Sequence, residues 1–187
     1  MGKVLRLVPY RADWTERYRA IADRLAPVIP AGAALHHIGS TAIPGMAAKD
    51  VIDLQLTVDR LGDLAADRLA GLGFVARPGR VDHVPAGAGC DAADCAKLYF
   101  TLAAPAAHLH VRERGRSNQR YALLFRDYLR ADPAAAAAYQ AVKLALIEAT
   151  GGDPLAYGAI KDPVCDGIIA AAERWARSVG WRVPDAG

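Results

Sequence analysis

The sequence predicts a single α+β (α/β) domain over residues 1–187, with a mixed β-sheet flanked by helices and a helical C-terminal half. Short runs rich in β-branched and aromatic residues alternate with helical patterns up to residue 112. From residue 117 onward the apolar spacing is helical, and three Asp-Pro pairs are each typical of a helix start. A chain of 187 residues is long enough for one domain with a sizeable core.

The first half supplies strands and two helices. Residues 3–8 predict a strand, and Asp13 with Glu16 forms the Asp-x-x-Glu pattern of a capping box. A helix face follows at spacings of three and four, formed by Trp14, Tyr18, Ile21, Leu25 and Val28. Residues 33–38 and 50–58 predict strands, and the loop between them is long enough for parallel or antiparallel pairing. Residues 61–72 predict a helix that Gly73 ends.

The second half begins with a loop. Residues 77–96 are rich in Gly, Ala and Asp without a clear period, which predicts a long loop. Residues 97–102 and 107–112 predict a β-hairpin. Ser117 is a good N-cap residue, and helices are predicted to start near Pro133, Pro154 and Pro163, the last two being either separate or one helix kinked at Pro163.

Composition limits the classes of partner. The net charge is +3 and the pI is near 8.8, with acidic and basic residues interspersed. This favours an anionic small molecule and no nucleic acid, because nucleic-acid-binding proteins gather basic residues on one face. No apolar run reaches the length needed to span a bilayer, so no membrane interaction is predicted. The sequence does not indicate a protein partner.

Cysteine usage predicts a reducing compartment. Cys90, Cys95 and Cys165 are an odd number, which argues against a disulfide framework and for the cytoplasm. The N-terminal stretch MGKVLRLVPYRADW becomes charged before a long apolar core develops, so no signal peptide is predicted. Cys90 and Cys95, with His83 upstream, are an alternative zinc pair. Zinc knuckles usually contain two tighter pairs, so ordinary thiols are the favoured interpretation.

Two predicted strands carry unusual polar faces. Side chains alternate along a strand, so Asp53 and Gln55 share one face of residues 51–58, while His108, His110 and Arg112 share one face of residues 108–112. A solvated face of an antiparallel sheet is the alternative interpretation. Such a face more often carries Lys and Glu than two His, an Asp and a Gln. The pattern therefore favours a ligand or metal site.

A small-residue turn precedes the Asp53 strand. Gly39 lets a ligand or another backbone come close, and Ser40 and Thr41 offer hydroxyls and backbone amides, the groups that hold phosphate. His37, just before the turn, is expected to orient it by a hydrogen bond. A phosphate-binding turn beside the Asp53 carboxylate is the pattern of a site for a metal-bound phosphate chain.

This combination resembles the nucleotidyltransferase superfamily, with its DNA polymerase beta-like fold, and more closely the GrpB family. The matching runs are HIGSTAIPGMAAKDVIDLQLTV (37–58), HLHVR (108–112), LLFRDYLRADP (123–133) and YGAIKDP (157–163). Similar domains resemble a C-terminal appendage of dephospho-CoA kinases in actinobacteria. The resemblance implies a nucleotidyltransferase-like fold and links the chain to coenzyme A metabolism.

The resemblance assigns roles at particular positions. Gly39 and Ser40 fall on the phosphate-binding turn, and Asp53 falls on the first metal-binding, catalytic acid, with Mg²⁺ as the implied cofactor. Gln55 stands where a second acid would, and Gln is a poor Mg²⁺ ligand because it supplies no charge. Lys161 matches a lysine that reaches phosphate in related folds. A solvated surface lysine is the alternative.

The metal-ligand set remains open between two arrangements. Asp53 and Gln55 form one, and Asp53 with His108 and His110 forms a two-His, one-carboxylate alternative. Arg112 is a further candidate phosphate contact, together with Arg114 and Arg116 at the end of the same strand.

Two functions follow from these candidates. One is nucleotidyl transfer from a nucleotide to an unknown acceptor. The other is a non-catalytic domain that binds a nucleotide or a CoA-like phosphorylated ligand, or that assists a partner enzyme. The shortage of carboxylates slightly favours the second, because a two-metal transfer needs several acids to hold both ions.

Overall fold

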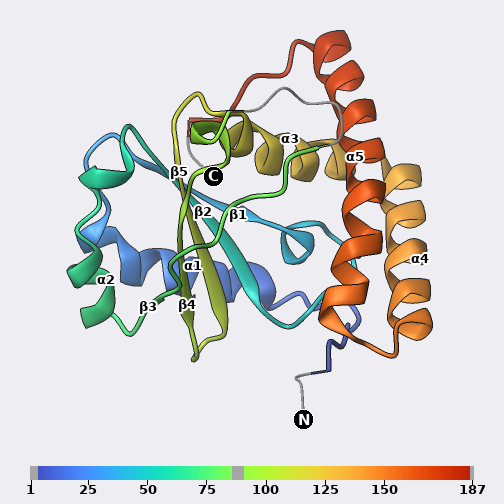
Figure 1. The fold of residues 1–187 in the computed structure, drawn as a ribbon, viewed down its shortest axis with the longest axis horizontal. Coiled ribbons are helices and arrows are strands. Elements are labelled where there is room, and N and C mark those ends of the chain that lie inside the picture. Colours follow the sequence, from blue (N-terminus) through green and yellow to red (C-terminus); the bar gives the residue numbers. More distant parts are fainter. Residues whose placement is uncertain (1–3, 86–90, 186–187) are drawn as a thin grey trace.

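A five-stranded mixed sheet forms the centre of the computed structural model, which describes residues 4–85 and 91–185 (Figure 1). The strand order is β1-β2-β5-β4-β3. Only β2 and β5 are parallel, and the other neighbouring strands are antiparallel. The strands are β1 Ala34–Ile38, β2 Ile52–Val58, β3 Val75–Ala76, β4 Leu98–Leu102 and β5 Ala107–Glu113.

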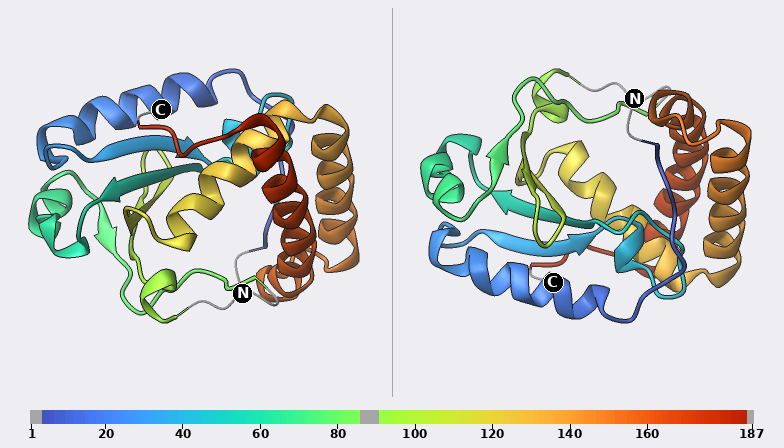
Figure 2. Two further views of the ribbon diagram at one scale, coloured as in Figure 1. Left: turned by 90° about the horizontal axis from the view of Figure 1, so that it is seen from above. Right: turned by 90° about the horizontal axis from the view of Figure 1, so that it is seen from below.

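Helices cover both faces and one end of the sheet. The α-helices are α1 Trp14–Leu25, α2 Ala66–Gly71, α3 Ser117–Ala131, α4 Pro133–Ala149 and α5 Pro154–Val179. The helix α1 lies against one face and α3 against the other, while α4 and α5 stand side by side at the end of the sheet (Figure 2). The predicted fold class, a mixed sheet flanked by helices with a helical C-terminal half, is confirmed.

Strand alternation separates an apolar face from a polar one. The side chains of Leu54, Leu56, Leu109 and Val111 are completely buried in the main core, which α1 closes. The intervening residues of β2 and β5 point to the α3 face. Because one face makes the core, the other can present polar side chains to the C-terminal helices.

The predicted strand at residues 3–8 is wrong. Residues 4–8 form a single bridge, Val8 to Ala48, and the backbone N–H of Leu5 donates to the carbonyl of Gly152 over 2.8 Å. The side chain of Leu5 packs with Leu146 and Tyr157. Leu5 and Leu7 of this segment therefore pack against the C-terminal helices instead of extending the sheet, while Val4 is exposed.

Two helix starts depart from prediction. The side chain of Asp13 makes no cap bond, because it is paired with Arg11 over 2.8 Å, so the predicted capping box does not form. Ser117 is the first residue of α3, and Arg116 occupies the N-cap position. By contrast, Asp132 and Asp153 accept from the backbone N–H two residues past their prolines, as predicted.

Two predicted spans are organised differently. Residues 61–72 form a 3₁₀ turn, Leu61–Asp63, followed by the short α2, because the side chain of Asp63 accepts from the N–H of Arg60 and closes the turn early. Pro163 lies inside α5 and does not divide it, which selects the single-helix alternative.

Two of the three cysteines lie within the described residues. Cys95 and Cys165 are buried, while Cys90, the other member of the predicted pair, lies outside the described residues. In the part of the chain that the structure describes, no helix is long and apolar enough to cross a membrane.

Candidate functional site

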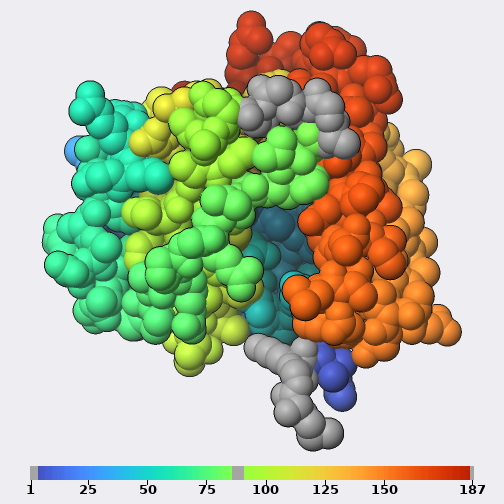
Figure 3. Space-filling view, viewed as in Figure 1, coloured from blue at the N-terminus to red at the C-terminus, as the bar shows by residue number. Residues whose placement is uncertain are grey.

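A cleft opens on the polar face of the sheet, between the strands and the C-terminal helices. In the space-filling view it is the hollow between the green chain and the orange part of α5, with blue and teal residues at its floor (Figure 3). It consists of two adjoining cavities of about 280 and 220 Å³, which share Gly39, Asp53, Tyr139 and Lys161.

The two cavities differ in their walls. We call the smaller one the lysine chamber, because three of its lining residues are Lys49, Lys143 and Lys161. We call the larger one the aromatic chamber, because Tyr121 and Phe125, with rings stacked at 6.0 Å, form part of its wall. The cleft therefore has a cationic part and an aromatic part that meet at Asp53.

Gly39 brings the turn directly against Asp53. Its φ angle is +72°, and a Cβ atom at this position would lie 2.7 Å from Oδ2 of Asp53. A side chain is excluded by both the backbone conformation and the space. Ser40 and Thr41 follow in a 3₁₀ turn, Ser40–Ala42, so glycine at position 39 is what permits this close approach.

C-terminal helices hold the loop after the turn. Nε of Arg130 in α3 donates to the carbonyl of Ala42 over 2.9 Å, and Gln140 in α4 accepts from the backbone N–H of Ala47. The loop is thereby fixed to two helices that lie far from it in the sequence.

Asp53 and the two histidines converge as the strand pattern predicted. Oδ1 of Asp53 lies 3.1 Å from Nδ1 of His108 and 3.8 Å from Nε2 of His110. Burial raises the pKa of Asp53, but hydrogen bonding from both imidazoles outweighs this effect and lowers the pKa. Asp53 is thus a carboxylate, and Nδ1 of His108 donates to it. With Nδ1 as the donor, Nε2 of His108 is the ring nitrogen that can accept a proton.

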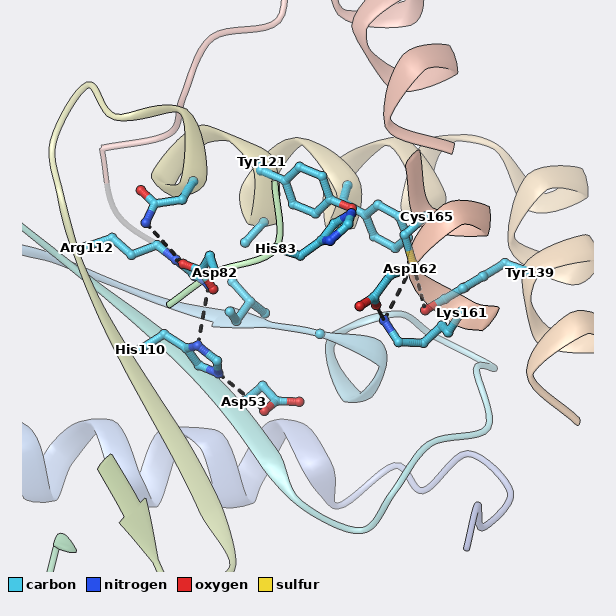
Figure 4. A pocket seen from close by; sticks show the side chains of 15 residues that line it. Asp53, Asp82, His83, His110, Arg112, Tyr121, Tyr139, Lys161, Asp162 and Cys165 are labelled. Carbon is cyan, nitrogen blue, oxygen red and sulfur yellow. Dashed lines mark hydrogen bonds and ion pairs between the residues drawn. The ribbon is translucent and has the colours of Figure 1, made fainter. Parts of the chain in front are cut away.

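The protonation of His110 follows from its neighbours. Its Nδ1 lies 3.4 Å from both Nζ of Lys97 and a guanidinium nitrogen of Arg112, and neither group can accept a hydrogen bond. Nδ1 therefore accepts, and the proton sits on Nε2, facing Asp53 (Figure 4). Burial, together with the two cations, lowers the pKa of His110 to about 4 despite the favourable contact with Asp53.

Arg112 is occupied inside the protein. It makes two bonds to Asp82, of 2.7 and 2.8 Å, and a third to Oε1 of Gln55. Asp82 also accepts from Lys97 over 2.6 Å and from Asn118 over 3.1 Å. This network fixes part of the predicted long loop onto the sheet, and its cations lower the pKa of Asp82 against the effect of burial.

The neighbouring arginines are also engaged. Arg114 pairs with Asp59 over 2.9 Å, and Arg116 pairs with Glu113 over 3.4 Å. The three arginines of this segment therefore all make ion pairs within the protein, and Arg112 also lines the aromatic chamber.

Gln55 is completely buried beside the cleft. Its amide oxygen accepts from Arg112, and its amide nitrogen donates to the carbonyl of Gln119 over 3.0 Å. Within the described residues, no group of three or more His, Cys, Asp or Glu is placed to hold a metal ion. A single carboxylate that already accepts from imidazole, beside a committed amide, does not fit the Mg²⁺ site that the resemblance implies.

Lys143 is the site residue that the sequence did not predict. Its side chain is 2 % exposed, Nζ donates over 2.8 Å to Oγ of Ser40 and also to the carbonyl of Ala47, and it lies 5.2 Å from the centre of the Tyr139 ring. Burial, with the positive charge of Lys161, lowers the pKa of Lys143 to about 8. A signal existed, since Lys143 is the single charged residue between Pro133 and Ile147.

Lys161 lies on the cleft wall, as expected for a ligand contact. Its ammonium is 3.0 Å from Asp162 and 3.7 Å from Sγ of Cys165, as Figure 4 shows. Lys49 completes the lysine chamber. Its sequence neighbour Asp50, a pairing partner that one interpretation of the sequence suggested, accepts from Trp14 and Arg17.

His37 supports the turn from behind. Its Nε2 lies 2.9 Å from Oγ1 of Thr41, and its ring stacks on Tyr18 of α1 at 4.8 Å. It is paired in register with Leu54, so it points to the apolar face, away from Asp53. Burial lowers the pKa of His37 to about 4. This geometry agrees with the expectation that His37 orients the turn, because its ring is hydrogen-bonded to Thr41 in that turn.

Comparison with known proteins identifies the family of this chain. The model of the family described as GrpB protein matches residues 4–171. The chain belongs to the GrpB family. A crystal structure of conserved protein GrpB from Enterococcus faecalis superposes with a TM-score of 0.70 at 24 % identity, covering 91 % of this chain and 99 % of that one. This likeness shows that the two proteins share a fold.

Relatives within the GrpB family have two kinds of name. A dephospho-CoA kinase of Mycolicibacterium paratuberculosis is 37 % identical over 95 % of this chain, which spans 48 % of the kinase. A UPF0157 protein of Streptomyces coelicolor is 33 % identical over 90 % of this chain and 82 % of its own length. The chain thus spans about half the length of the kinases it matches.

Proposed function

We propose that this GrpB-family chain binds a nucleotide or other phosphorylated small molecule, with the phosphate groups in the lysine chamber. Buried Lys143 carries this proposal. A buried ammonium is costly unless it is paired, and among the described residues no carboxylate forms an ion pair with it. A phosphate beside Ser40 would supply the missing negative charge at a position where a hydroxyl already accepts from Lys143.

The aromatic chamber suits the organic part of such a ligand. Tyr121 and Phe125 offer ring surface next to the phosphate position, and Asp82 and His83 add polar groups at the same wall. Cavities that combine apolar walls with a few polar groups are typical of small-molecule sites. The names of the kinase relatives make coenzyme A a reasonable member of the ligand panel.

Thermal unfolding tests the proposal directly. ATP, coenzyme A and inorganic pyrophosphate are each added at millimolar concentration, with and without Mg²⁺. A ligand at one hundred times its Kd stabilises the folded state by about 2.7 kcal/mol, which raises Tm by about 5–10 °C in a chain of this size. No increase with any of the three would contradict the proposal.

Nucleotidyl transfer is a second candidate, favoured by the pair Asp53 and His108. His108 lines the lysine chamber and its Nδ1 lies 3.1 Å from Asp53, so Nε2 is the ring nitrogen that could accept a proton from a bound acceptor. An acceptor hydroxyl would give its proton to Nε2 while its oxygen bonds to the α-phosphorus, and pyrophosphate would leave. Pyrophosphate release from the four ribonucleoside triphosphates with a panel of acceptors tests this step, and absence of release would leave a binding role alone.

The chain spans about half the length of its kinase relatives, and this favours a role beside a partner enzyme. In the kinase relatives a second segment accounts for about half of the protein. Mixing this chain with the other half of such a kinase and measuring kinase activity and Tm tests for assistance. A change in neither quantity would contradict it.

A further inference from the structure

We propose that the lysine chamber binds a diphosphate group through protein lysines alone, without a divalent metal ion. This inference rests on the proposed function and adds to it the class of ligand and the absence of a metal requirement. It departs from what the fold resemblance implies.

The carboxylate side of the site argues against a metal. Oδ1 of Asp53 is 3.1 Å from an imidazole N–H of His108, and Oδ2 lies against Gly39, where even a Cβ atom would be 2.7 Å away. Mg²⁺ demands near-ideal octahedral oxygen ligands and favours carboxylates. A metal would have to displace the imidazole, and Gln55 cannot compensate because Arg112 and Gln119 occupy its amide.

The lysine side supplies the charge that a metal would otherwise bring. Lys143 and Lys161 approach the chamber from α4 and α5, and Lys49 approaches from the segment before β2. The same chamber contains Asp53 as its one carboxylate. Asp162 pairs with Lys161 over 3.0 Å, so three ammonium groups meet two carboxylates and the wall keeps a net positive charge. Burial, and then the charges of Lys161 and Lys49, lower the pKa of Lys143.

The number of ammonium groups selects a diphosphate. A single phosphate carries about −1.5 to −2 near neutral pH, which fewer than three lysines balance. A diphosphate carries more charge and spreads it over two phosphorus centres, so it can contact Lys143 beside Ser40 and Lys161 at the opening to the aromatic chamber simultaneously. Lys161 lines both cavities, which places the second phosphate where the organic group begins.

Isothermal titration calorimetry with inorganic pyrophosphate tests the inference. Pyrophosphate is added to the wild-type chain in EDTA and, separately, in excess Mg²⁺. The expected result is binding in EDTA at least as tight as in Mg²⁺, because Mg²⁺ removes charge from the ligand before it meets the lysines. Orthophosphate is expected to bind at least about tenfold more weakly, since it loses one charge-assisted contact.

The outcomes separate this inference from the proposed function. Binding that requires Mg²⁺ would overturn the metal-free site and leave phosphate binding intact. Equal affinity for orthophosphate and pyrophosphate would overturn the diphosphate assignment. No binding in either buffer would overturn the inference and would count against the proposed function as well.

Single variants locate the binding site. Lys143→Gln and Lys161→Gln are each expected to lower the affinity in EDTA by about tenfold or more. The side chain of Lys161 is 29 % exposed, so its variant disturbs the core less than Lys143→Gln. Arg177→Gln is the matched control, because it removes one positive charge from the same helix about 24 Å further along its axis. Unchanged affinity in both lysine variants would overturn the inference.

Discussion

Nζ of Lys143 lies 2.8 Å from Oγ of Ser40, although 103 residues separate them in the sequence. The contact joins α4 to the turn that precedes Asp53 and places a buried ammonium where we propose that phosphate binds. Because its acceptors are a hydroxyl, a carbonyl and an aromatic ring, the charge of Lys143 is solvated by the protein without being neutralised. This relation underlies the proposed function.

Proton uptake should accompany ligand binding near pH 8. The pKa of Lys143 is about 8 in the free protein, so roughly half of these side chains are neutral at that pH. The negative charge of a bound phosphate opposes the effects of burial, Lys161 and Lys49, so it raises the pKa of Lys143. The Lys143 side chains that were neutral in the free protein then take up protons. Calorimetry of pyrophosphate binding at pH 8 in buffers of different ionisation enthalpy should show about half a proton taken up. Lys143→Gln should abolish the uptake, and an equal uptake in that variant would contradict the assignment.

Gly39→Ala should destabilise the fold more than Gly45→Ala. Both glycines have φ angles near +75°, so each variant loses about 1 kcal/mol of unfolding free energy from backbone strain. Only at Gly39 does the new Cβ meet Asp53, at 2.7 Å, whereas nothing lies within 4 Å at Gly45. We expect at least about 1 kcal/mol of extra loss for Gly39→Ala, measured by urea unfolding. Equal losses would show that Asp53 does not depend on this close approach.

Asp82→Asn should release the loop from the sheet. Asp82 pairs with Arg112 and Lys97, whose side chains are 6 % and 8 % exposed, so the substitution leaves buried cations without a partner. We expect a loss of about 3 kcal/mol in the free energy of unfolding. Asp59→Asn is the control, because Asp59 is 72 % exposed and its pair with Arg114 should contribute less than about 1 kcal/mol. Similar losses in urea unfolding would rule out a special role for Asp82.

Three histidines should remain neutral down to about pH 5. Burial lowers the pKa values of His36, His37 and His110 to about 4, below the ordinary 6.5. The unfolded chain therefore takes up protons that the folded chain does not. The contribution of these three histidines to the free energy of unfolding is complete above pH 6.5 and is lost as the pH drops toward 4. Their imidazole resonances in NMR titrations should not move between pH 8 and 5, and a midpoint near 6.5 for any of them would contradict this environment.

Strand alternation made part of the site predictable. A period of two fixes which residues share a face, so Asp53 had to lie with Gln55, and His108 with His110. The two strands needed only to be neighbours for these side chains to meet, and β2 and β5 are neighbours. The turn before Asp53 was predictable for a similar local reason, because its backbone conformation, with a φ angle of +72° at position 39, favours glycine.

Residues placed by tertiary packing were not predictable. Lys143 reaches the turn only because α4 packs beside it, and Asp82 reaches Arg112 only because a loop without a regular period folds over the sheet. Residues 4–8 have the alternation of a strand, yet Leu5 and Leu7 pack against residues of α4 and α5 instead of joining the sheet. Propensity and spacing describe one segment at a time, so contacts between distant segments remain outside their reach.

A crystal structure of the chain grown or soaked with millimolar pyrophosphate in the absence of Mg²⁺ tests the central claim most directly. We expect phosphate oxygens within about 3 Å of Nζ of Lys143 and of Lys161, next to the turn at Ser40. Asp53 should keep its contact with His108. Pyrophosphate bound outside the cleft, or a lysine chamber that contains only water at saturating ligand concentration, would contradict the account.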